Sequence, residues 1–133
     1  MSITPNPEQF KALANASDAG KVVMLNLLKF KERADGEQGT GAQAYARYGD
    51  AAVEMIEARG GKVLWAGRAD QMLIGDPAED WDTVLLVEYP SRRAFIEMVT
   101  APDYQAAHSH REHGLERTVV VACTPGLDRI REP

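Results

Sequence analysis

Three side chains with useful chemistry recur at helical spacing near the end of the chain. Tyr104, His108 and Arg111 are four and three positions apart, which puts them on one face of a helix. His108 is a candidate acid or base, Arg111 a candidate holder of a carboxylate or enolate, and Tyr104 a candidate pocket wall. A surface helix with a histidine near its C-terminus explains the same pattern, and Glu112 would then pair with His108.

Two polar residues interrupt apolar segments. Asn26 lies within VVMLNLLKF (22–30) and Glu88 within TVLLVEY (83–89). A buried amide or carboxylate costs several kcal/mol without a partner. In the functional interpretation both point into a pocket, where Asn26 orients the substrate and Glu88 is a general base. In the alternative, Glu88 pairs with an arginine or meets solvent at the end of the sheet, and Asn26 satisfies backbone groups.

Three aromatic residues form a second candidate group. Tyr45, Tyr48 and Trp65 would line a pocket for a flat organic ligand if they meet between a helix and a sheet. Packing in the core explains them equally well. Asn26 and Tyr48 are the expected orienting donors.

A metal site is not expected. His108 and His110 would point about 200° apart on a helix, and no carboxylate or cysteine is assured beside His110 and His113. A single histidine without a haem motif is weak support for haem. The chain has no G-x-S-x-G, P-loop or G-x-G-x-x-G, so the sequence implies no cofactor.

Capping and turn patterns predict the elements that carry these residues. Asn6, Pro7 and Gln9 begin a first helix that ends near Ala16, and Thr40 with Gln43 begins a second. The glycine-containing segment 31–41 between them is the candidate lid. The further predicted elements are strands 22–30, 62–66 (extending past a bend at Gly67 toward 73–74), 83–89 and 118–123, and helices 42–59, after Ser91, and 103–113.

This order is a ferredoxin-like βαββαβ pattern after an extra N-terminal helix. It predicts an α+β fold with a four-stranded antiparallel sheet and helices on one face. Three of the four strands are apolar on both sides, whereas a sheet with one solvated face should alternate apolar and polar residues. We therefore expect the second face to be covered by another copy, giving a homodimeric α/β barrel.

Length and composition limit the number of domains, the classes of partner and the cellular location. The 133 residues predict a single domain with its core at about 20–124, an N-terminal helix in 1–19 and a tail at 125–133. A net charge of -5 argues against nucleic acid and anionic membranes. One cysteine, no apolar run near 20 residues and no signal-peptide pattern predict a cytoplasmic protein.

Five segments carry a family resemblance: VVMLNLLKF, YARYG, GGKVLWAG, TVLLVEYPSRRAF and DYQAAHSHREH. With them, the chain resembles the domain-of-unknown-function family 1330, of the dimeric α/β-barrel, ferredoxin-like superfamily. The superfamily includes cofactor-independent monooxygenases, lactone isomerases, haem-binding proteins and stress-response proteins. We therefore expect a homodimer that binds a small organic, in particular acidic, metabolite, with cofactor-independent proton transfer, isomerisation or oxidation as the candidate chemistry. The alternatives are a non-catalytic ligand-binding or stress-related dimeric scaffold and a haem protein.

Overall fold

A computed structural model describes residues 4–16 and 20–130 of the chain. The helices are α1 (Pro7–Asn15), α2 (Gly41–Ala58), α3 (Arg92–Val99) and α4 (Pro102–Gly114), and the strands are β1 (Val22–Phe30), β2 (Lys62–Arg68), β3 (Thr83–Tyr89) and β4 (Leu115–Cys123). After α1, this order is the predicted ferredoxin-like pattern, with α3 and α4 in place of a single second helix. The turn expected at 18–20 lies largely outside the described residues.

The predicted helix caps are present. Asn6 accepts a hydrogen bond from the backbone N–H of Gln9, and Thr40 does the same for Gln43. In both boxes the glutamine side chain also accepts from the backbone N–H of the cap residue. These reciprocal bonds satisfy backbone groups that a helix start leaves unpaired, so they set where α1 and α2 begin.

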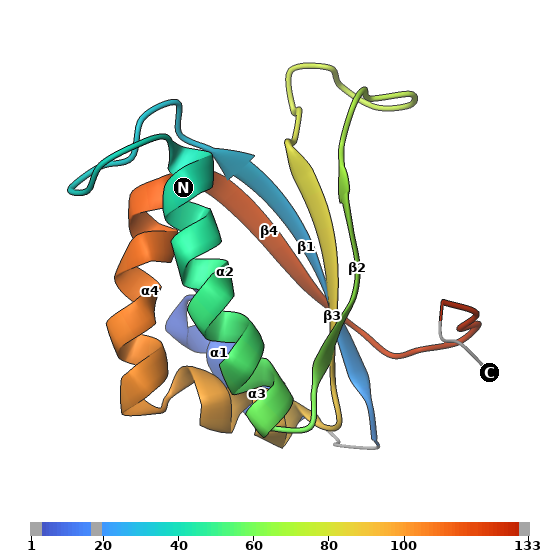
Figure 1. Cartoon of the computed structure of the whole chain (residues 1–133). Helices are drawn as coiled ribbons and strands as arrows, with labels where there is room; N and C mark the ends of the chain where they lie inside the picture. The colour runs from blue at the N-terminus through green and yellow to red at the C-terminus, as the bar shows by residue number, and fades with distance from the viewer. Residues whose placement is uncertain (1–3, 17–19, 131–133) are drawn as a thin grey trace.

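The four strands form one antiparallel sheet in the order β2-β3-β1-β4. Figure 1 shows the helices gathered on one side of it, with α2 and α4 running side by side. The prediction of a four-stranded antiparallel sheet with helices on one face is therefore confirmed. No helix in the described ranges 4–16 and 20–130 is long and apolar enough to cross a membrane.

The core lies between the sheet and the helices. Strand residues of even number in β1, including Val22 and Met24, and odd number in β3, including Val87 and Tyr89, point to the helices. The core cluster also contains Ala52 and Ile56 from α2, Met98 from α3 and Tyr104 from α4. This face of the sheet positions the site described below.

The opposite face of the sheet, called the open face below, is also apolar. Leu25, paired with Leu86 on β3 and Val121 on β4, belongs to it. Val121 is 46% exposed in the single chain. The sheet is therefore apolar on both faces, as the strand sequences indicate, and side chains of the open face such as Val121 remain exposed in the single chain.

Strand β2 is shorter than expected. It ends at Arg68, and the following residues 69–82 form a loop in which Leu73 and Ile74 are 84% and 88% exposed. The predicted extension toward 73–74 is therefore wrong. The irregularity expected at Gly67 lies instead between Val63 and Trp65, where the β2–β3 register shifts.

Candidate functional site

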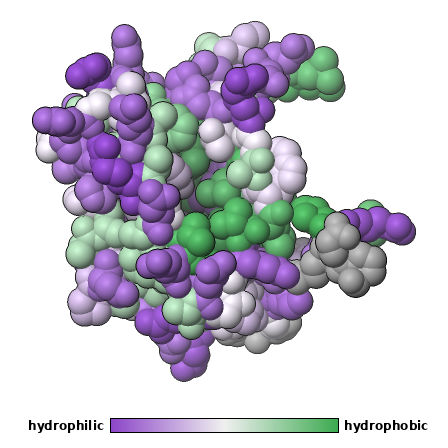
Figure 2. Space-filling model, in the orientation of Figure 1, coloured by the Kyte–Doolittle hydropathy of each residue, from purple (hydrophilic) through white to green (hydrophobic). Residues whose placement is uncertain are grey.

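A cavity of about 1050 Å³ lies between the sheet and the helices. Its walls come from all four strands on one side, with β2 contributing Val63, and from all four helices on the other. Figure 2 shows apolar atoms gathered in the hollow between the helices and the strands. A mostly apolar cavity of this size with a few convergent polar groups is typical of a site for a small organic ligand.

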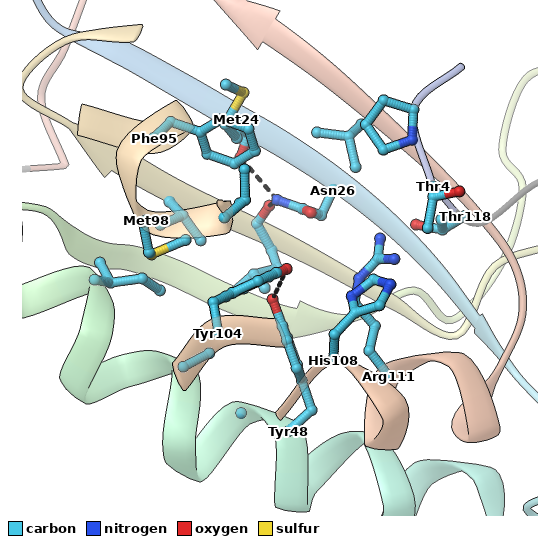
Figure 3. A pocket seen from close by; sticks show the side chains of 18 of the residues that line it. Thr4, Met24, Asn26, Tyr48, Phe95, Met98, Tyr104, His108, Arg111 and Thr118 are labelled. Atoms are coloured by element: carbon cyan, nitrogen blue, oxygen red, sulfur yellow. Dashed lines mark hydrogen bonds between the residues drawn. The ribbon is translucent and has the colours of Figure 1, made fainter. Parts of the chain in front are cut away.

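Helix α4 supplies three polar side chains of the site. Tyr104, His108 and Arg111 all line the cavity, as their helical spacing predicts. Figure 3 shows the imidazole of His108 and the guanidinium of Arg111 next to each other, opposite Asn26. Tyr104 and Arg111 are buried. A cation enclosed in an apolar wall acts on its neighbours through a low local dielectric.

His108 is held in its neutral form. Burial lowers its pKa below the usual value, the positive charge of Arg111 acts in the same direction, and Glu112 opposes both. Nε2 lies 3.5 Å from Oε1 of Glu112, which favours the tautomer with the proton on Nε2. Nδ1 then carries the lone pair; it is buried, and within residues 4–16 and 20–130 no group hydrogen-bonds to it. A neutral imidazole is the form that accepts a proton.

Two tyrosines are coupled beside the histidine. The hydroxyls of Tyr48 and Tyr104 lie 2.8 Å apart, and the two rings meet edge to face. Burial raises the pKa of Tyr48 well above its usual value and that of Tyr45 to about 12, with Arg111 acting against burial in each case. The phenols of Tyr48 and Tyr45 are therefore neutral at pH 7. Because one hydroxyl of the Tyr48–Tyr104 pair must donate to the other, the pair retains one proton for a further acceptor.

Asn26 meets the cavity from the floor of the sheet. Its Nδ2 donates to the backbone oxygens of Met24 (3.0 Å) and Leu85 (3.3 Å). Asn26 therefore hydrogen-bonds to the backbone and also lines the cavity, so the two expectations for it are compatible. With both amide protons directed to the backbone, the group left for a ligand is the acceptor Oδ1. The predicted role of Asn26 as an orienting donor becomes that of an acceptor.

Glu88 does not share this cavity. It is paired with Val23 across β1 and with Lys62 across β2, so its side chain belongs to the open face. The prediction that it points into the pocket is wrong. The reason is the two-residue period of a strand, which sends Val87 and Tyr89 to the helices and Glu88 to the other side.

Trp65 is also absent from the cavity. Val63 pairs with Val87 on the helix face, but after the register shift Trp65 pairs with Leu86 on the open face. Its indole packs over Gly67 on that face, and the residue is 50% exposed. The expected aromatic lining is therefore wrong at Trp65. Tyr45 and Tyr48 do meet, with ring centroids 5.2 Å apart, and both line the cavity.

The segment 31–41 is fastened to α4 rather than placed over the cavity. The carboxylate of Glu37 lies 2.6 Å from Nδ1 of His113, 2.9 Å from Nδ1 of His110 and 2.7 Å from Nε of Arg47. The hydrogen bonds from the two histidines, foremost that of His113, lower the pKa of Glu37 to about 2. None of the residues 31–41 lines the cavity, so the geometry does not support the expectation of a lid.

Sequence reasoning missed two parts of this arrangement. The first is Glu37, whose distance along the chain from His110 hid their contact. Within residues 4–16 and 20–130, no group of three or more His, Cys, Asp or Glu side chains is placed to hold a metal ion. The second is the contribution of α1 and the segment before it, where Phe10, Leu13 and Thr4 close one end of the cavity. The amphipathic pattern of α1 was the signal for it.

The fold and the cavity together define a ferredoxin-like α+β protein with a pocket between its sheet and its helices. Comparison with known proteins then places the chain. Residues 37–124 match the model of DUF1330, a domain of unknown function, and the chain belongs to that family.

Solved structures share the fold of this chain. A protein of unknown function from Rhodopseudomonas palustris is 40% identical, with a TM-score of 0.88, over 95% of this chain and 98% of that chain. A dabb family protein with a ferredoxin-like fold from Mesorhizobium loti is 18% identical, with a TM-score of 0.51, over 80% of this chain and 97% of that one. A dimeric ferredoxin-like protein of unknown function from Thermobifida fusca is 16% identical, with a TM-score of 0.50, over 80% and 92%. No curated protein matches the sequence.

Proposed function

We propose that this protein is a cytoplasmic homodimer in which each subunit binds a small organic metabolite in the cavity between sheet and helices. The observation that carries the proposal is the cavity itself: a large, mainly apolar space into which Asn26, Tyr48, Tyr104, His108 and Arg111 converge from three elements. A protein core normally closes such space, because unfilled volume costs stability. A ligand recovers the lost contacts.

The polar groups specify the kind of ligand. Arg111 favours a carboxylate or an enolate, and the apolar walls favour an organic body. Oδ1 of Asn26 accepts hydrogen bonds, and the lone pair on the buried Nδ1 of His108 accepts one when the side chain turns to uncover it. A hydroxyl group or another donor on the ligand therefore complements them. An acidic organic molecule with one donor group fits these features best.

Proton transfer is the chemistry that the same groups support. Neutral His108 can take a proton from the ligand, and the charge of Arg111 would stabilise the anion that results. The chain's own groups supply this step, so it needs no cofactor. Glu88, on the other face of the sheet, is left out of it.

The homodimer is supported by the open face. Its apolar side chains would form a continuous exposed patch in a single subunit, and soluble monomers seldom expose patches beyond a few hundred Å². The same face of a second copy covers it in one self-complementary interface. The Thermobifida fusca protein described as dimeric shares the fold, which is consistent with this arrangement.

Native mass spectrometry of the purified protein tests assembly and ligand together. We expect a mass of two subunits plus retained small molecules, which denaturing conditions release. Ala122→Phe places a ring at the cavity wall on edge strand β4 and should abolish retention without unfolding the protein. Ala12→Phe, on the exposed side of α1 and away from the cavity, is the matched control. A lone subunit in the wild type, or equal retention in both variants, would contradict the proposal.

Binding can also be followed with a defined probe. Anilinonaphthalene sulfonate is an aromatic anion whose fluorescence rises in apolar sites. We expect Arg111→Met, which keeps the length and apolar stem of the side chain, to weaken probe binding at least tenfold. His108→Gln should leave binding within about threefold but abolish any turnover of an identified substrate. If His108→Gln retains turnover, His108 is not the proton acceptor; if the wild type turns over no ligand that it binds, the non-catalytic scaffold replaces the enzyme.

A further inference from the structure

The floor of the cavity changes from polar to apolar along the strands. Asn26 of β1 pairs with Leu85 of β3, and Met24 pairs with Val87. Met24 faces the same side of the sheet as Asn26 and follows it by two residues, which is about 7 Å along a strand. Met24 and Val87 are both buried and line the cavity. The polar floor is thus confined to the neighbourhood of Asn26.

Helix α4 has the same polarity along its axis. Its C-terminal residue Gly114 accepts a hydrogen bond from the backbone N–H of Lys31, next to β1, at 2.8 Å. Arg111 is one turn from that end, whereas Tyr104, at the other end of the helix, belongs to the core cluster with Met98. Figure 3 shows Phe95 and Met98 on the side of the cavity away from His108 and Arg111. The cavity therefore has a polar end and an apolar end.

The polar end contains a buried cation. Among the described residues that line the cavity, Arg111 is the only lysine or arginine and Asp50 is the only acidic residue. Arg111 is 9% exposed, whereas Asp50 is exposed on α2. A carboxylate gains most from a guanidinium where little water screens the pair. An acidic group of a ligand is therefore directed to the end of the cavity that holds Arg111.

Helices α1 and α3 close the apolar end. The two helices lie against each other (Figure 1), and Phe10 and Leu13 of α1 line the cavity together with Phe95 of α3. No residue of α1 is buried, and Phe10 and Leu13 are half-buried. An apolar chain beneath α1 would remove more of these two side chains from water. This end therefore favours a ligand with an apolar tail.

We propose that the ligand of this cavity is an amphipathic monocarboxylic acid, with its carboxylate at Arg111 and its apolar chain extending along α4 to the wall formed by α1 and α3. This inference rests on the proposed function and names its substrate class. Arg111 and Tyr104 are about 10 Å apart along the axis by the rise of an α-helix, which matches an extended chain of about eight carbons. A shorter acid would leave the apolar end empty, and an uncharged chain would gain nothing from Arg111.

A series of straight-chain acids tests the proposal. We measure the dissociation constants of butanoate, hexanoate, octanoate, decanoate and dodecanoate by isothermal titration calorimetry, below the concentrations at which they form micelles. The dissociation constant should fall about fourfold for each added methylene group. This decrease should stop near the chain length of about eight carbons that the helix rise sets. A dissociation constant that does not change with chain length would overturn the inference.

The role of Arg111 is tested by a matched pair of ligands. Octanoate and 1-octanol have the same chain and differ in charge, and octanoate should bind the wild type at least tenfold more tightly. Arg111→Met should abolish this difference. Equal binding of the two ligands to the wild type would overturn the placement of the carboxylate, and this comparison needs no variant to fold.

Two variants with matched controls test the position of the chain. Ala52→Leu adds a side chain from α2 at the apolar end and should shorten the preferred acid, whereas Ala58→Leu makes the same change at an exposed position of α2 outside the cavity. Leu13→Ala should weaken octanoate binding at least fivefold and butanoate binding less than twofold. Leu73→Ala, in the exposed loop after β2, should change neither. Equal effects of Leu13→Ala on the two acids would place the chain elsewhere.

The failure of this inference differs from the failure of the proposed function. If anilinonaphthalene sulfonate or a retained molecule occupies the cavity but no acid of the series binds, the substrate class is wrong and the binding function stands. If the purified protein retains nothing and binds neither the probe nor any acid, the binding function itself is wrong.

Discussion

Two glycines of α2 should respond to alanine in opposite ways. Gly49 sits in the middle of the helix, and a Cβ placed there meets no atom within 4 Å. Gly41 is the first residue of the helix, and a Cβ there meets the backbone oxygen of Lys31, with the Lys31 nitrogen and the Gly114 oxygen each 2.6 Å away. Backbone atoms cannot rotate aside as a side chain can. Both positions have ordinary helical geometry, so only the space around them differs.

The magnitudes follow from these surroundings. Gly49→Ala removes the entropic cost of a helical glycine and should stabilise the protein by about 0.5–1 kcal/mol. Gly41→Ala gains little, since it lies at the helix end, and its clash should cost about 1–3 kcal/mol. For a chain of this length, each kcal/mol corresponds to roughly 3–5 °C in Tm. We expect Gly49→Ala to raise Tm by a few degrees and Gly41→Ala to lower it by about 5–10 °C.

Thermal and urea unfolding, followed by circular dichroism, measure both variants at one fixed protein concentration, because the stability of any oligomer depends on concentration. Gly114→Ala tests the same junction from α4, where a Cβ would lie 2.5 Å from the oxygen of Gly41. It should also destabilise. A Gly41→Ala variant as stable as Gly49→Ala would refute the close approach of Lys31, Gly41 and Gly114 on which the reasoning depends.

Two further predictions concern the polar clusters. The pKa of Glu37 is about 2 in the folded chain, below the ordinary 4.5, so the folded state binds fewer protons than the unfolded state. This contribution to stability is complete above pH 4.5 and is lost as the pH falls toward 2. The free energy of unfolding of Glu37→Gln should therefore decrease less than that of wild type between pH 4.5 and pH 2, and an equal decrease in the two proteins would contradict the prediction. Tyr48→Phe and Tyr104→Phe should each cost about 1 kcal/mol in urea unfolding, and the double variant should reveal a coupling of about 0.5–1.5 kcal/mol from their shared hydrogen bond; additive effects would mean that the bond contributes nothing.

Much of the site's α4 wall could be predicted because it is local. Tyr104, His108 and Arg111 need only a helix to share a face, and the helix followed from capping and periodicity. The contact between His108 and Glu112 is equally local. Asn26 was identified because an amide stands out in an apolar strand.

The errors came from non-local geometry. The sequence of β2 does not reveal that one extra residue near Leu64 turns Trp65 to the open face, because a bulge is set by pairing with β3. The face of Glu88 depends on the same sheet register. Glu37 reaches His110 and His113 only because β1 and α4 bring segment 31–41 beside the end of α4, through bonds such as Asp35 N–H to the His113 oxygen at 3.0 Å.

The order of helices and strands, their caps and the apolar character of both sheet faces were determined by the sequence alone, because each depends on residues a few positions apart. Which side chains share the cavity was decided by the tertiary structure. Strand register and helix packing join residues dozens of positions apart, and a shift of a single residue moves a side chain to the other face of the sheet.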